Sequence, residues 1–186
     1  MIHEHDAFLV ACYSDHPLIH MLRESQCMKH FSTISSRLQL LDTATHKLVM
    51  GILEASVIDA LARGSKFGVL TTGVSWVAPL TKVISELLGA SKEDFAGVVA
   101  TGLGVLEFHT SSSSHPQGKD DVVKDNIRIA AQTLVGCGSN VIVLGCAGME
   151  GIEDVVKVGL SASREVKVVD SVRAGIDIIT KKLLDS

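Results

Sequence analysis

Six short apolar runs, separated by segments with helical periodicity, constrain the fold of this sequence more than any other feature. Each run is rich in Val, Ile, Leu and Ala without regular polar alternation, as in parallel strands that are buried on both faces. The runs are 7–11, 48–52, 67–70, 97–100, 141–144 and 166–169. Strands that alternate with helices predict a doubly wound α/β fold, in which ligands bind beyond the carboxyl ends of the strands.

The helices are predicted from apolar residues that recur every three or four positions. They are expected at 17–24, 55–62, 76–88, 121–135, 152–158 and 171–184. The stretch at about 25–45 has no such period and is rich in Ser and Thr. We therefore expect an irregular insertion between the first helix and the second strand.

Charge and hydropathy narrow the classes of partner. The formal net charge is -4 and no basic patch is present, which argues against a nucleic-acid partner. No apolar run approaches the roughly 20 residues that a membrane helix requires, so no membrane partner is expected. The polar N-terminus carries no signal-peptide pattern, and we expect a cytoplasmic protein.

Two of the four cysteines share one local setting. Cys12 and Cys146 each follow an apolar strand and precede a turn into a helix, whose partial positive charge favours a thiolate. Two thiols that face each other across a cleft can invert a chiral carbon without a cofactor, one removing a proton and the other delivering one. Buried core cysteines are the alternative, but the matched settings favour chemistry. Cys137 precedes its strand and is given no role.

The residues around both cysteines resemble a known family. Residues 9–18 (LVACYSDHPL) and 143–149 (VLGCAGM) resemble the two cysteine motifs of hydantoin and allantoin racemases. Residues 69–72 (VLTT) resemble the substrate-binding segment, and 168–170 (VVD) the last strand. The sequence is thus similar to the cofactor-independent Asp/Glu/hydantoin racemase superfamily, and most similar to fungal members linked to nitrogen metabolism.

This resemblance implies two facing, doubly wound parallel-sheet lobes. Residues 1–64 plus 165–186 would form the first lobe, with the last strand and helix returning to it, and 65–164 the second. Family members open with a further strand that ends in Asn-Pro-Asn, which this sequence lacks. We therefore expect the first lobe to be truncated at its N-terminus.

The resemblance also assigns the site. It implies that Cys12 and Cys146 are the acid/base pair and that Thr71 and Thr72 hold the polar edge of the substrate. Backbone amides at Tyr13 and Ala147 would stabilise an enolate oxygen. Neither a cofactor nor a metal is implied.

The implied activity is racemisation of a 5-substituted hydantoin or of allantoin by a homo-oligomer. One alternative is an Asp/Glu-type amino-acid racemase. Such relatives carry Cys-Asn-Thr and Gly-Cys-Thr, whereas Cys-Tyr-Ser and Gly-Cys-Ala stand here. Another is a truncated, non-catalytic homologue that only binds a ligand or oligomerises.

Overall fold

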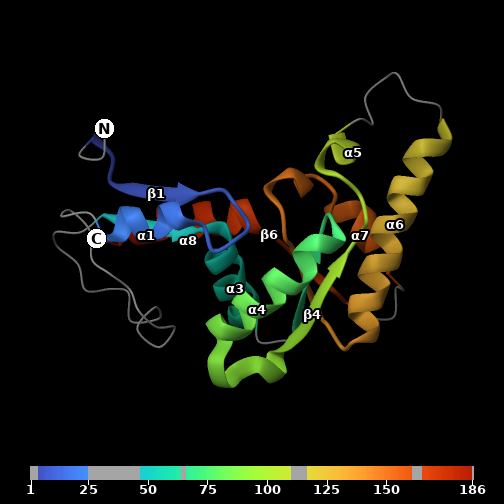
Figure 1. The fold of residues 1–186 in the computed structure, drawn as a ribbon, viewed down its shortest axis with the longest axis horizontal. Coiled ribbons are helices and arrows are strands. Elements are labelled where there is room, and N and C mark those ends of the chain that lie inside the picture. Colours follow the sequence, from blue (N-terminus) through green and yellow to red (C-terminus); the bar gives the residue numbers. More distant parts are fainter. Residues whose placement is uncertain (1–3, 25–46, 64–65, 110–116, 161–164, 186) are drawn as a thin grey trace.

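The computed structural model describes residues 4–24, 47–63, 66–109, 117–160 and 165–185. The described residues form an α/β fold with parallel sheets (Figure 1). The strands are β1 (Ala7–Val10), β2 (Leu48–Gly51), β3 (Phe67–Thr71), β4 (Phe95–Ala100), β5 (Val141–Leu144) and β6 (Lys167–Asp170). The expected insertion at about 25–45 lies outside the described residues.

Helices separate the strands, as the sequence predicts. The α-helices are α1 (Pro17–Glu24), α3 (Ile52–Ala62), α4 (Val77–Leu88), α5 (Val105–His109), α6 (Gln117–Gly136), α7 (Glu153–Val158) and α8 (Ser171–Leu184). Short 3-10 turns are η2 (Val74–Trp76), η3 (Gly89–Asp94) and η4 (Ala147–Met149). No helix among the described residues is long and apolar enough to span a membrane.

The strands pair in two sheets. One holds β1 and β2, and the other has the order β4-β3-β5-β6, with every pairing parallel. The last strand, expected to return to the first lobe, pairs with β5 in the four-stranded sheet. The helix that follows does reach the first sheet, since α8 contacts both β1 and β2. The division into 1–64 plus 165–186 and 65–164 stays a prediction.

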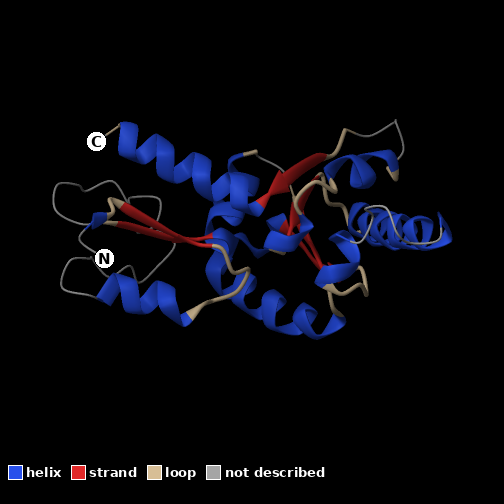
Figure 2. Ribbon diagram, turned by 90° about the horizontal axis from the view of Figure 1, so that it is seen from above, coloured by secondary structure: helices blue, strands red, loops and turns tan. Residues whose placement is uncertain are grey.

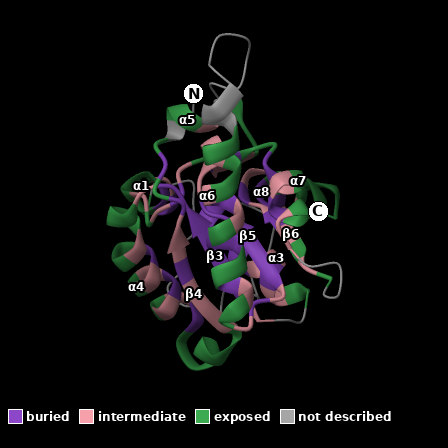
Figure 3. Cartoon of the chain, turned by 90° about the vertical axis from the view of Figure 1, so that its right-hand side faces the viewer, coloured by how far each residue is buried: buried purple, intermediate pink, exposed green. Residues whose placement is uncertain are grey.

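The central strands β3 and β5 of the four-stranded sheet are buried at every position, which explains their continuous apolar sequence. Val69 and Val143 pack with α3, α4 and α8, whereas Leu70 and Ile142 pack with α6 and α7. Figure 3 shows α6 lying across β3 and β5, with its outer side exposed and the strands buried behind it.

The two-stranded sheet is covered by α1 on one side and α8 on the other (Figure 2). Val10 and Val49 pack with Ile19 of α1. On the other side α8 approaches β1 closely at Gly175, where an added Cβ would lie 2.6 Å from Leu9 Cδ1. A side chain at residue 175 would therefore require the end of the Leu9 side chain to move.

A buried ion pair ties α1 to β2 and α3. Arg23 is 4% exposed, and its Nη2 donates to Glu54 Oε2 at 2.6 Å while Nη1 donates to Oε1 at 3.1 Å. The same guanidinium donates to the Val49 carbonyl from Nη2 at 2.9 Å and from Nε at 3.3 Å. These bonds fix α1, the helix that follows the Cys12 turn, against β2 and the start of α3.

Removing one charge of this pair should destabilise the protein strongly. Glu54→Gln leaves the Arg23 charge buried, and we expect a loss of about 3–5 kcal/mol in the free energy of unfolding. Asp59→Asn is the matched control on α3, because it breaks the more exposed Asp59–Arg63 pair at 2.7 Å and should cost less than about 1 kcal/mol. Urea unfolding measures both. Equal losses in the two variants would contradict a stabilising role for the buried pair.

Candidate functional site

Parallel register brings the carboxyl ends of the central strands to one edge. Leu70 of β3 is the partner of Leu144 of β5, so the residues that follow these strands lie side by side. Gly145 N donates to the Leu70 carbonyl at 2.8 Å, and Thr71 Oγ1 donates to the Gly145 carbonyl at 3.5 Å. The threonine segment and the Cys146 segment are therefore adjacent at the edge where α/β folds bind ligands.

Thr71 and Thr72 are both buried at this edge, 1% and 5% exposed. Their carbonyls accept hydrogen bonds from the segment after β4: Thr101 N donates to Thr71 O at 2.8 Å, and Gly102 N to Thr72 O at 2.9 Å. Thr101 Oγ1 also donates to Thr72 O at 3.3 Å. Thr101 is not among the residues predicted from the sequence, although a threonine directly after a strand is the same signal that Thr71 and Thr72 provide.

Cys12 is half-buried in the turn that follows β1. Its sulfur lies 3.2 Å from Ser14 Oγ, within hydrogen-bond distance, and Ser14 N donates to the Cys12 carbonyl at 2.9 Å. Helix α1 begins only at Pro17, so a turn separates the thiol from the helix expected beside it. Ser14 is thus a neighbour of the Cys12 thiol for which the sequence predicted no role.

Cys146 is also half-buried and directly precedes η4. Its backbone is extended, and its carbonyl accepts from Met149 N at 3.1 Å to close this single turn. Ala147, the predicted amide donor, is the first residue of that turn. By contrast, Cys137 is exposed before β5, at the opposite end of this strand.

The Tyr13 side chain connects the two cysteine turns. Tyr13 is 7% exposed, and an added Cβ at Gly145 would lie 3.3 Å from its Cε1 atom. Its hydroxyl is hydrogen-bonded to that of Ser56 at 3.2 Å, and Ser56 Oγ also donates to the Leu53 carbonyl at 2.9 Å. The sequence predicts only a backbone role for Tyr13, because an aromatic residue after a strand does not show which neighbour its ring packs against.

Burial raises the pKa of Tyr13 well above its ordinary value, and the hydrogen bond to Ser56 opposes this only in part. A phenol with this pKa stays neutral at physiological pH. The ring and hydroxyl therefore serve packing and hydrogen bonding, and the acid/base candidates at this edge are the thiols.

Tyr13 is the single tyrosine of the chain, so its titration can be followed by absorbance near 295 nm. We expect no tyrosinate signal near pH 10, the ordinary value, while the protein is folded. Because the folded pKa is raised, the associated stability is complete below about pH 10 and is lost as the pH rises further. A tyrosinate signal in the folded protein near pH 10 would contradict this burial, and Tyr13→Phe provides the blank.

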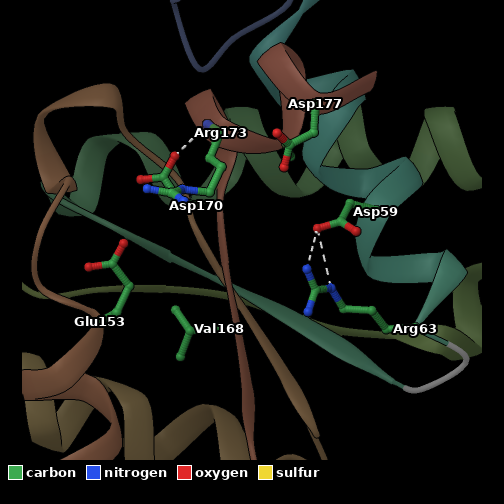
Figure 4. A pocket seen from close by; sticks show the side chains of 8 residues that line it. Asp59, Arg63, Glu153, Val168, Asp170, Arg173 and Asp177 are labelled. Atoms are coloured by element: carbon green, nitrogen blue, oxygen red, sulfur yellow. Dashed lines mark hydrogen bonds and ion pairs between the residues drawn. The ribbon is translucent and has the colours of Figure 1, made fainter. Parts of the chain in front are cut away.

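A charged pocket of about 190 Å³ lies beside β6, at an edge of the four-stranded sheet (Figure 4). Its lining residues are Asp59, Arg63, Glu153, Val168, Asp170, Arg173, Ala174 and Asp177. Two of the carboxylates have structural partners, since Asp59 is paired with Arg63 and Asp170 accepts from the backbone N of Arg173 at 2.7 Å. No predicted site residue lines this pocket. In the part of the chain that the structure describes, no three His, Cys, Asp or Glu side chains are grouped to hold a metal ion.

Comparison with known protein families shows to which family this chain belongs. The family described as Asp/Glu/Hydantoin racemase matches residues 2–179. This chain belongs to that family. Two similar fungal relatives are the uncharacterized protein C1F7.10 of Schizosaccharomyces pombe, 33% identical over 174 residues, and protein DCG1 of Saccharomyces cerevisiae, 25% identical over 179 residues. Each match covers 94% of this chain, which spans 61% and 64% of the respective relatives.

Solved structures support the same racemase fold. The chain superimposes on an allantoin racemase from Klebsiella pneumoniae with a TM-score of 0.65 and 20% identity, over 96% of this chain and 60% of that one. For the allantoin racemase of Pseudomonas fluorescens the TM-score is 0.60 at 18% identity, over 96% and 91% of the two chains. The family membership and the α/β fold with parallel sheets are thereby confirmed. The roles of the six predicted site residues stay predictions.

Proposed function

We propose that this protein is a cofactor-independent racemase of 5-substituted hydantoins, allantoin included, and that Cys12 and Cys146 are its acid/base pair. The observation that carries the proposal is the packing of the Tyr13 ring beside Gly145, which joins the turns that bear the two half-buried thiols. The family membership and the similarity to two allantoin racemase folds agree with it.

The proposed reaction moves one proton onto and one proton off the same ring carbon. The thiolate of one cysteine takes the proton from C5, and the C–H electron pair passes into the enolate of the adjacent carbonyl. The other thiol delivers its proton to the opposite face of C5, which inverts the centre. Each turnover leaves the two thiols with exchanged protonation states, so the reverse reaction uses them in exchanged roles.

The neighbouring groups suit a neutral ring. Backbone amides at Tyr13 and Ala147 would donate to the enolate oxygen as it gains charge. The hydroxyls of Thr71 and Thr72 would bind the ring's polar edge. Asp/Glu-type racemases carry Cys-Asn-Thr and Gly-Cys-Thr where this sequence has Cys-Tyr-Ser and Gly-Cys-Ala, and this difference favours a hydantoin over aspartate or glutamate.

The two cysteines can be separated by their stereochemistry. Cys12→Ser and Cys146→Ser should each lower racemisation by about 10²–10⁴-fold, because a serine hydroxyl is a far weaker acid than a thiol and supplies no anionic base near neutral pH. In D₂O each variant should still exchange the C5 proton of one enantiomer, and the preferred enantiomer should differ between the variants. Polarimetry and proton NMR on each enantiomer measure the two effects.

Cys137→Ser is the matched control, since that thiol is exposed at the far end of β5. It should racemise at the rate of the unsubstituted protein. Full activity in either of the other two variants would rule out the two-thiol mechanism. Racemisation of aspartate or glutamate but not of hydantoins would favour an amino-acid racemase, and binding without racemisation would indicate a non-catalytic homologue.

A further inference from the structure

We infer that Tyr13 is a positioning residue, whose buried ring fixes the Cys12 turn at a set distance from the Cys146 turn. Its catalytic consequence rests on the racemase function proposed above, but the positioning itself is a property of the fold. Tyr13 follows Cys12 in the chain, so anchoring its ring restricts the backbone that carries the thiol.

The ring reaches the second turn because residue 145 has no side chain. A Cβ at Gly145 would lie 2.5 Å from Val69 Cγ1 and 3.0 Å from the Leu70 carbonyl, in addition to its 3.3 Å approach to the Tyr13 ring. The ring therefore packs against the backbone directly before Cys146, with no flexible side chain between them. A contact of this kind fixes a separation more tightly than two mobile side chains would.

The other end of the tyrosine is held by a helix. Ser56 and Leu53 belong to α3, and the chain of hydrogen bonds from the Tyr13 hydroxyl to Ser56 and on to the Leu53 carbonyl links the ring to that helix. The ring also belongs to the hydrophobic core formed by α3, α4, α8 and the four-stranded sheet. Tyr13 thus attaches the turn after β1 to the other sheet, with which β1 shares no hydrogen bonding.

Two acid/base groups that act on opposite faces of one carbon must be held within about 0.5 Å of their working geometry. Losing the ring should therefore separate the thiols without altering either thiol chemically. The direct measure is the ability of a short bis-methanethiosulfonate reagent to bridge Cys12 and Cys146. Cys27→Ser and Cys137→Ser together leave these two as the only thiols.

In this background Tyr13→Leu should lower the ratio of bridged to singly labelled protein severalfold. Intact-protein mass spectrometry measures this ratio. Tyr13→Phe keeps the ring against Gly145 and should retain most of the bridging. The matched control is Phe67→Leu, which removes a buried aromatic ring at the opposite end of β3 and should leave the ratio unchanged at a similar cost in stability.

Unchanged bridging in Tyr13→Leu, or an equal loss in Phe67→Leu, would overturn the inference. If Tyr13→Leu does not fold, the folded Tyr13→Phe variant serves as the test. Finding only singly labelled protein in that variant, with no bridged product, would overturn the role of the ring contact.

On a hydantoin, Tyr13→Leu should lower kcat by about 10²-fold with little change in KM, since misplacing catalytic groups by 1 Å has an effect of this size. Bridging does not depend on turnover, so absence of racemisation would count against the proposed function alone.

Discussion

The contact between the Tyr13 ring and Gly145 is the interaction on which the candidate site depends. The described strands form two separate hydrogen-bonded sheets, so strand pairing does not set how the turn after β1 meets the turn after β5. The packing of the Tyr13 ring and its hydrogen bond to Ser56 link the two instead. A glycine at 145 leaves space for the ring, and the apolar core around Val69 and α3 holds it there. The arrangement of the two cysteine-bearing turns thus follows from one close approach rather than from continuous backbone pairing.

Much of this arrangement could be predicted from local sequence. Strand β5 is observed at Val141–Leu144, where the apolar run is expected, because a strand buried on both faces needs apolar residues at every position. The predicted strand ends placed Thr71, Thr72 and Cys146 at one edge, since parallel strands in register end together. These predictions required only the pattern within each segment and the rules of parallel sheets.

Other features depend on contacts between distant segments, and the sequence pattern does not encode them. The run ending at Val169 predicts that a strand forms but not which strand it pairs with, so its pairing with β5 was not predicted. Arg23 has the sequence signature of an exposed helix residue, yet it is buried against a carboxylate 31 positions away. The Tyr13 ring was missed for the same reason, because its partners Ser56 and Gly145 are remote in the chain.

The central claim is that the turns after β1 and β5 form one site for a ring whose chiral carbon lies between two thiols. A crystal structure with 5-methylhydantoin bound tests it most directly. The account predicts the ring at the edge beyond Thr71, with the sulfurs of Cys12 and Cys146 on opposite faces of C5. A ligand bound instead in the charged pocket beside β6, or with both sulfurs on the same face of C5, would contradict it.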